Sequence, residues 1–329
     1  MSGRRVAVVA GGPSTEAEVS RTSGRAVHKA LAEAGFAAEL LELDATLPAR
    51  LVATGFDVVF PATHGALGED GGLQGLLEVL DLPYVGSGVL ASALAMSKPH
   101  AKAQFRQYGL PVADDAVLRR GEDVAAAVPE LRLRLGGALA IKPASGGSAI
   151  GVALLDADVG DAAIQDAIER AFQADDFVLV ERCLRGHEVT CGVLERDSGA
   201  TALPPTLITA KAGNFYDFTS KYQAGGSEHR CPAPFAPPVI GRLQGLAVAA
   251  HAALGARDLS RVDFVVGDGN DPNSVTVLEL NSLPGMTSTS LFPEAAGVAG
   301  IGFTELCSSL VQRALARPRR AVPFAPAMP

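Results

Sequence analysis

Two apolar runs near the C-terminus carry polar residues two positions apart: Arg261 and Asp263 in the first, Glu279 and Asn281 in the second. Apolar, β-branched runs predict strands, and residues two apart in a strand share a face. The Gly- and Asp-rich segment 267–272 predicts a hairpin that brings the four side chains onto one patch. Carboxylate and amide oxygens are the ligands that Mg²⁺ takes beside phosphates. The alternative is an edge hairpin whose polar face is merely solvated.

A glycine-rich run, 145–151, lies between two predicted strands, 138–142 and 152–155. It cannot be a Walker loop, because that loop must open a helix. A flexible loop between strands can instead cover a triphosphate with its backbone N–H groups and Ser hydroxyls. Lys142 ends the leading strand within reach of a phosphate, although a solvated strand-end lysine is the alternative.

A second glycine-rich run, Gly86-Ser-Gly88, follows a short predicted strand and precedes a helix. This pattern occurs in dinucleotide folds, but the acidic residue expected about 20 residues later is missing. A tight strand-to-helix turn is the alternative.

The predicted elements divide the chain into three units. The first 95 residues alternate strand and helix, which predicts a parallel sheet covered by helices. A second unit holds the glycine-rich run, an amphipathic helix at 161–174 and a strand at 177–181. The third holds the hairpin and a Pro- and Gly-rich stretch, 203–238, whose length predicts a functional lid or a disordered loop.

The composition is that of a globular protein with a substantial core: 329 residues, 48% hydrophobic and 19% charged. A net charge of −8 argues against nucleic-acid binding, and no apolar run approaches the roughly 20 residues that span a bilayer. The four cysteines show no metal spacing, so we expect free thiols in a reducing cytoplasm.

Taken together, the motifs resemble those of the D-alanine–D-alanine ligases of the ATP-grasp superfamily over nearly the whole chain. The matching runs stand in the family's order: 11–20, 64–75, 83–88, 96–98, 142–143, 215–222, 231–233, 261–263, 279–281 and 284–291. The resemblance implies an ATP-grasp fold that mixes α/β and α+β parts. Its three domains would cover residues 1–96, 97–185 with the phosphate loop, and 186–329 with the lid and the Mg²⁺ site.

The family's reaction joins two D-alanines to D-alanyl-D-alanine for peptidoglycan precursors, using ATP and an acyl phosphate. It therefore implies ATP and D-alanine as ligands, Mg²⁺ as cofactor with Mn²⁺ as a substitute, and a cytoplasmic homodimer as the assembly. For the nucleotide, the resemblance assigns phosphate binding to Lys98 and Lys142, the adenine pocket to Glu181, Arg182 and Leu184, and the ribose to Glu188. It assigns the metal to Asp263, Glu279 and Asn281.

The remaining roles concern the amino acids. Arg261 and the Gly285 N–H would stabilise the oxyanion, and Ser290 and Leu291 would bind the second carboxylate. Glu18 would hold the first ammonium, with His64 beside the first carboxylate and Ser148 and Tyr222 in a hydrogen-bonded chain with Glu18. Lys221, next to Tyr222, is typical of family members that take an amine as second substrate.

Some of these residues have simpler explanations or depart from the family's pattern. Glu18 also completes a Thr-x-x-Glu capping box that starts at Thr15, and His64 could be a turn residue. The phosphate loop has Gly146 and Ala149 where the family carries a bulkier residue and a second Ser, which puts the affinity for nucleotide in question. The competing functions are a related ligase for D-lactate, D-serine or another amino acid, and a catalytically silent ATP-binding protein.

Overall fold

The structure is a computed structural model that describes residues 3–147, 151–210, 227–267, 271–287 and 289–318. Its N-terminal part is a three-stranded parallel sheet of order β2-β1-β3. After Arg5, β1 is completely buried, as expected for a parallel strand covered on both faces. The elements are β1 (Arg5–Ala10), α1 (Ala17–Glu33), β2 (Ala37–Glu42), α2 (Leu47–Thr54), β3 (Val58–Pro61) and α3 (Gly72–Val79).

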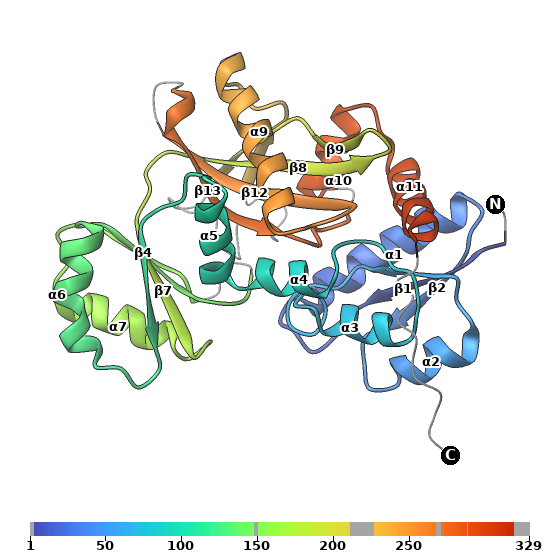
Figure 1. Cartoon of the computed structure of the whole chain (residues 1–329), viewed down its shortest axis with the longest axis horizontal. Helices are drawn as coiled ribbons and strands as arrows, with labels where there is room; N and C mark the ends of the chain where they lie inside the picture. Colours follow the sequence, from blue (N-terminus) through green and yellow to red (C-terminus); the bar gives the residue numbers. More distant parts are fainter. Residues whose placement is uncertain (1–2, 148–150, 211–226, 268–270, 288, 319–329) are drawn as a thin grey trace.

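The middle of the chain forms a four-stranded antiparallel sheet of order β4-β7-β5-β6, seen at the left of Figure 1. Two helices cover it, and its hydrophobic cluster contains only residues of this part of the chain. The elements are β4 (Asp115–Arg119), α6 (Val124–Leu135), β5 (Leu139–Pro143), β6 (Ala153–Leu155), α7 (Asp161–Ala171) and β7 (Phe177–Arg182).

The C-terminal part is a six-stranded antiparallel sheet of order β11-β10-β8-β12-β13, with β9 paired to β8. The predicted hairpin is confirmed, because β12 and β13 pair in the order that sets Arg261 against Asn281 and Asp263 against Glu279. The elements are β8 (His187–Arg196), β9 (Gly199–Ala202), β10 (Thr206–Ala210), β11 (Ser227–Arg230), α9 (Pro237–Ala253), β12 (Leu259–Val266), η2 (Pro272–Ser274), β13 (Val275–Asn281), α10 (Leu291–Val298) and α11 (Phe303–Ala316).

Two helices, α4 (Val89–Met96) and α5 (Lys98–Gln107), lie between the sheets. Ala101 and Phe105 of α5 share a hydrophobic cluster with the six-stranded sheet and α9. Helices α10 and α11 pack in one cluster with β1, β3 and α1, so the N- and C-terminal parts are joined by a common core. The three predicted domain ranges stay a proposal.

Most predicted elements lie where expected, with two differences. The stretch 203–238 is not a single irregular loop, because β10 and β11 lie in it; its residues 211–226 are outside the described ranges. The short strand predicted at 83–85 is reduced to one bridge between Val59 and Tyr84. The Gly86-Ser-Gly88 run is a turn that leads into α4, consistent with the tight-turn interpretation.

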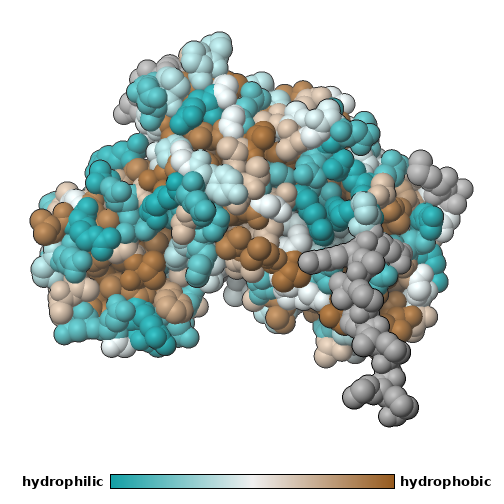
Figure 2. All heavy atoms as spheres, in the orientation of Figure 1, coloured by the Kyte–Doolittle hydropathy of each residue, from teal (hydrophilic) through white to brown (hydrophobic). Residues whose placement is uncertain are grey.

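The surface carries both polar and apolar residues over the face drawn in Figure 2. Among the described residues, no helix combines the length and apolar character that crossing a membrane requires. The four cysteines are unpaired, as predicted.

A buried polar cluster connects the N-terminal sheet to the C-terminal one. Asp258 is 1% exposed and accepts hydrogen bonds from the Gly86 N–H at 2.7 Å and from Arg317 Nη2 at 2.6 Å. Nearby, His251 is 2% exposed; its Nδ1 lies 2.7 Å from Ser260 Oγ and its Nε2 lies 3.6 Å from Glu195 Oε1. Burial lowers the pKa of His251, and the attraction of Glu195 and Asp258 opposes this only in part.

This lowered pKa predicts a loss of stability in acid. Below pH 6.5, the ordinary pKa of histidine, His251 is protonated in the unfolded chain but stays neutral in the folded one. The free energy of unfolding therefore falls as the pH drops towards the folded pKa. One such group contributes at most about 1.4 kcal/mol per pH unit. We expect His251→Asn to unfold with a flatter pH dependence between pH 7 and 5, measured by urea denaturation. A slope for His251→Asn equal to that of the wild type would contradict the prediction.

Candidate active site

Arg261, Asp263 and Asn281 of the hairpin form one hydrogen-bonded cluster with Thr190 of β8. Asp263 accepts from Arg261 Nε at 2.9 Å, Arg261 Nη2 at 2.8 Å, Asn281 Nδ2 at 3.1 Å and Thr190 Oγ1 at 2.6 Å. The side chains of Arg261 and Asp263 are only 17% and 18% exposed. The cluster is therefore held and largely covered, unlike the solvated edge considered as the alternative.

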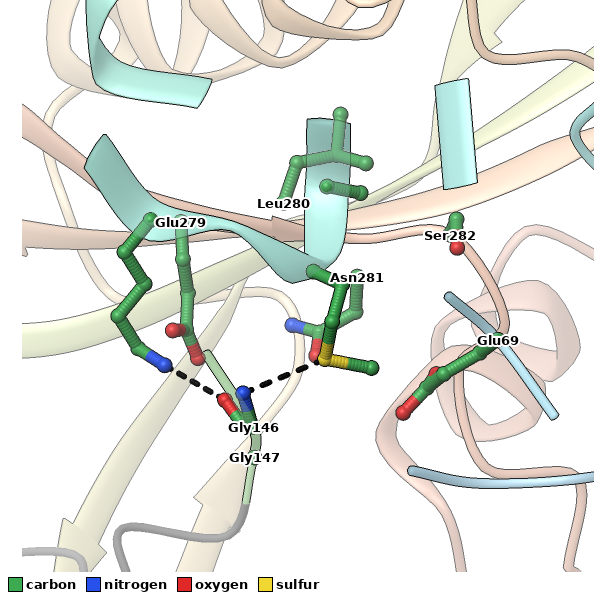
Figure 3. Close-up of a pocket in the computed structure, with 10 residues that line it drawn as sticks. Glu69, Gly146, Gly147, Glu279, Leu280, Asn281 and Ser282 are labelled. Atoms are coloured by element: carbon green, nitrogen blue, oxygen red, sulfur yellow. Dashed lines mark hydrogen bonds between the residues drawn. The ribbon is translucent and has the colours of Figure 1, made fainter. Parts of the chain in front are cut away.

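An open pocket lies beside this cluster and joins separate parts of the chain (Figure 3). Glu279 and Asn281 line one side, Glu69 another, and the α4–α5 junction and the start of the glycine-rich loop complete it. Its lining residues are Glu69, Ala95, Met96, Lys98, Gly146, Gly147, Glu279, Leu280, Asn281 and Ser282. Three of the predicted site residues, Lys98, Glu279 and Asn281, thus share one pocket.

The start of the glycine-rich loop is fixed against the α4–α5 junction. Lys98 Nζ donates to the Gly146 carbonyl at 2.5 Å, and the Gly146 N–H donates to Met96 Sδ at 3.3 Å, as Figure 3 shows. Gly146 has a φ of +92°, a region that favours glycine, so this departure from the family's pattern has a conformational reason. Ser148 and Ala149 lie outside the described residues.

Two of the predicted nucleotide residues, Lys142 and Glu181, form an ion pair between the neighbouring strands β5 and β7. Lys142 Nζ lies 2.5 Å from Glu181 Oε2, and Lys102 Nζ bonds to the other oxygen of Glu181. Glu181 is 3% exposed, and burial alone would raise its pKa, but Lys142 and Lys102 outweigh burial and lower the pKa to about 2. Burial would lower the pKa of Lys142, but Glu181 and Glu279 raise it above its ordinary value. Both groups are therefore charged at neutral pH.

The other predicted nucleotide residues follow along the connection from β7 to β8. Arg182 is exposed and forms an ion pair with Asp114 at 2.9 Å, whereas Leu184 is half-buried in the connection. Glu188 is half-buried on β8, opposite Val265 of β12.

The structure does not support the role predicted for Glu18. Its side chain is 73% exposed and bonds to Arg21 and Arg25, three and seven residues further along α1. These arginines hold the pKa of Glu18 below its usual value. Nor does Glu18 close a capping box, since no side chain caps the start of α1.

Glu16, two residues earlier, lies next to the glycine-rich loop instead. It is 7% exposed and stands just before α1 begins at Ala17. A Cβ added at Gly147 would lie 3.3 Å from Glu16 Oε2, and one at Gly65 would lie 3.4 Å from the same atom. Glu16 therefore lies between the glycine-rich loop and the turn that follows His64. Two glutamates two residues apart look alike in sequence, and the capping pattern drew attention to the wrong one.

His64 and Glu69 both lie close to Glu16. The sequence predicts a role for His64 but none for Glu69. His64 is 8% exposed; burial lowers its pKa, although the attraction of Glu16 opposes this. Glu69 accepts from the Gly65 N–H at 2.8 Å and lines the pocket, yet no role was predicted for it. Burial, with repulsion from Glu16, raises the pKa of Glu69 to about 8, so it carries a proton at pH 7.

Glu69 yields a prediction about stability at high pH. A carboxyl whose pKa is raised gives stability that is present below its ordinary value of 4.5 and lost as the pH rises through about 8. Glu69→Gln keeps an acceptor for the Gly65 N–H without the charge. We expect its melting temperature to exceed that of the wild type by roughly 4–10 °C more at pH 9 than at pH 6, about 2–3 kcal/mol for the two pH units below the folded pKa. A difference that is the same at both pH values would contradict the raised pKa.

The loop between β13 and α10 completes the site. A Cβ added at Gly285 would lie 2.9 Å from Ser290 Oγ, so these two predicted residues are neighbours. Ser290 precedes the first residue of α10, Leu291, and its Oγ accepts from the Thr287 N–H at 3.0 Å. Lys221 and Tyr222 lie outside the described residues.

The parallel sheet beside two antiparallel sheets, with lysines and a glycine-rich loop facing a carboxylate cluster, defines an ATP-grasp protein. Family models described as "D-ala D-ala ligase N-terminus" and "D-ala D-ala ligase C-terminus" match residues 44–87 and 104–312. The chain belongs to the D-alanine–D-alanine ligase family.

Individual relatives agree with this assignment. The chain is 41% identical to the D-alanine–D-alanine ligase of Syntrophotalea carbinolica, covering 95% of this chain and 97% of that one. It is 42% identical to the D-alanine–D-alanine ligase of Geobacter sulfurreducens, covering 93% of each. A crystal structure of the Bacillus anthracis D-alanine–D-alanine ligase complexed with ATP matches with a TM-score of 0.79 and 29% identity, covering 96% of this chain and 98% of that one.

Proposed function

We propose that the chain catalyses the ATP-dependent ligation of two D-alanines to D-alanyl-D-alanine through an acyl phosphate. The observation that carries this is the shared pocket, in which Lys98 and the glycine-rich loop face Glu279 and Asn281. A phosphate-binding loop and a metal-binding carboxylate set on opposite walls of one pocket suit phosphoryl transfer to a small acid. Membership in the family supports the choice of D-alanine.

The proposed reaction has two steps. A carboxylate oxygen of the first D-alanine attacks the γ-phosphorus of ATP, which gives the acyl phosphate and releases ADP. The neutral amine of the second D-alanine then attacks the acyl carbon. The tetrahedral species collapses to the dipeptide as phosphate leaves, and the amine loses its proton.

Residues of this chain stabilise the charge that develops in each step. Lys98 and Lys142 bind the phosphate oxygens, and Arg261 with the Gly285 N–H binds the oxygen that becomes negative on the tetrahedral carbon. Ser290 and Leu291 hold the second carboxylate at the start of α10. In this proposal Ser148 and Tyr222 remain the partners that close the site, and Lys221 favours an amine as the second substrate.

Asp263, Glu279 and Asn281 offer two carboxylates and an amide, the oxygen donors that suit Mg²⁺ or Mn²⁺. The geometry fits such an ion, because Asp263 and Glu279 face each other across adjacent strands. Arg261 and Asn281 donate hydrogen bonds to Asp263 and thereby orient it. When bound, the metal supplies positive charge that neutralises the phosphates during transfer.

Recognition of the first D-alanine is reassigned from Glu18 to Glu16. Glu16 is buried next to Gly147 and close to His64, where an ammonium and a carboxylate of a small amino acid can both be bound. His64 stays in the proposal as the neighbour of the first carboxylate. Glu181, Arg182 and Leu184 are proposed to border the adenine, and Glu188 to hold the ribose.

We also propose the pathway, the compartment and the assembly in which the enzyme works. The product serves peptidoglycan precursor synthesis in the cytoplasm, and the enzyme is a homodimer. On α4, Val89 and Leu90 are 41% and 72% exposed. Figure 2 shows a hydrophobic patch in the middle of the face where Figure 1 places α4, a surface that a second copy could cover. Light scattering on the purified protein would give the assembly directly.

A substrate panel tests the proposed function. ADP release from ATP and Mg²⁺ is measured with D-alanine, L-alanine, D-serine and D-alanine plus D-lactate, and products are identified by mass. We expect turnover and D-alanyl-D-alanine with D-alanine alone. Faster formation of the D-serine or D-lactate product would indicate a related ligase, and no turnover with any of them would indicate a silent ATP-binding protein.

A further inference from the structure

A row of cations runs along one face of α5. Lys98, Lys102 and Arg106 are spaced four residues apart, so they lie one above the other on the helix. Lys98 contacts the glycine-rich loop, and Arg106 Nη2 pairs with Asp115 Oδ2 at 2.5 Å. Lys102, between them, is 1% exposed, and it is among the largest fully buried side chains described. A buried ammonium in this position needs an explanation, because its burial is costly unless it is paired.

Lys102 joins two strands at the end of the four-stranded sheet. It bonds to Glu181 of β7 and, at 2.8 Å, to Asp115 of β4. These two carboxylates are direct cross-strand partners, and both stand where the chain enters or leaves this sheet. Since α5 packs with the six-stranded sheet, Lys102 fixes the end of one sheet to the body of the other.

Glu181 is shared between Lys102 and Lys142, one lysine on each oxygen. The ion pairs connect Lys142, Glu181, Lys102, Asp115 and Arg106 in one chain. Three cations and two carboxylates leave one positive charge in excess. Without Lys142, two cations and two carboxylates remain, and the net charge of the remaining ion pairs is zero.

We propose that Lys102 is a positioning residue of the nucleotide site, which stays paired with Glu181 while Lys142 leaves Glu181 for the phosphates of ATP. Lys142 is the natural member to leave, because its side chain is 17% exposed whereas that of Lys102 is 2% exposed. Without Lys102, Lys142 would be the one partner left to the Glu181 side chain among the residues that the structure describes. Binding of phosphate would then leave a buried carboxylate unpaired, which is unfavourable. The inference rests on the nucleotide site proposed above.

The test compares ATP with adenosine, which has no phosphate. Binding to wild type, Lys102→Met, Glu181→Gln and the double variant is measured by titration calorimetry with Mg²⁺ present. We expect Lys102→Met to raise the Kd for ATP about tenfold or more, with the Kd for adenosine within about twofold of wild type. In steady state the same variant should raise KM for ATP and leave kcat at saturating ATP within about threefold. Lys29→Met, a control that removes an exposed lysine of α1 outside this chain of ion pairs, should bind ATP as the wild type does.

The double variant shows whether Lys102 acts through Glu181. With Glu181 neutral, Lys142 is free whether or not Lys102 is present, so the double variant should bind ATP within about twofold of Glu181→Gln. Neither Glu181→Gln nor the double variant leaves a carboxylate unpaired at position 181. Their comparison therefore remains informative if Lys102→Met alone does not fold. Equal weakening of adenosine and ATP would overturn the inference, as would the same tenfold loss in the Glu181→Gln background. Failure of the wild type to bind ATP would instead refute the proposed nucleotide site itself.

Discussion

Glu279→Gln should lower kcat several hundred-fold or more in a protein that remains folded. Glu279 lies opposite Asp263 on the neighbouring strand and lines the pocket with Lys98. The substitution keeps the shape and removes one of two carboxylates available to Mg²⁺, a loss of about 3–4 kcal/mol of transition-state stabilisation, as for other groups aimed at developing charge.

The measurement is ADP release with D-alanine over a series of Mg²⁺ concentrations, and the variant should also need more Mg²⁺ for half-maximal rate. Glu228→Gln is the matched control, because Glu228 is an exposed carboxylate on β11 of the same sheet. It should turn over as the wild type does. A near-normal rate for Glu279→Gln would mean that the polar face of the hairpin binds no metal and is only a structural cluster.

Glu16→Gln and Glu18→Gln should differ by two orders of magnitude or more in kcat/KM for the first D-alanine. Glu16 is buried beside Gly147, whereas Glu18 is held on the surface by Arg21 and Arg25. Loss of a buried charge that pairs with a substrate ammonium costs roughly 2–5 kcal/mol. An exposed ion pair contributes about 0–1 kcal/mol.

The two variants are controls for each other, because both remove one charge near the start of α1. Initial rates are measured over a range of D-alanine concentrations at saturating ATP, where the first binding site fills at the lower concentrations. We expect Glu18→Gln to remain within about twofold of wild type. Equal losses in both variants would refute the reassignment and restore the role first predicted for Glu18.

The parallel sheet and the hairpin could be predicted because their patterns are local. β1 is a continuous apolar run, and β12 and β13 flank a turn-forming segment. β10 and β11 could not be separated from the Pro- and Gly-rich stretch around them. β10 pairs with β8 and β11 pairs with β10, which no local pattern reveals.

The hairpin residues of the site were foreseen for the same reason, since the two-residue period of a strand sets their shared face. The roles of Glu16, Glu69 and Lys102 could not be predicted in this way. Lys102 stands in a helix whose sequence, Lys98–Gln107, reads as a polar surface helix. Its burial results from carboxylates 13 and 79 residues away that reach it only in the folded chain.

Isotope transfer tests the central claim most directly. D-Alanine labelled with ¹⁸O in both carboxylate oxygens is incubated with ATP, Mg²⁺ and the enzyme, and the phosphate and dipeptide are analysed by mass spectrometry. If the first carboxylate attacks the γ-phosphorus, each turnover moves one ¹⁸O atom into inorganic phosphate and leaves one in the new peptide carbonyl. Phosphate without ¹⁸O, formed at the same rate as the dipeptide, would contradict an acyl phosphate and with it the proposed mechanism.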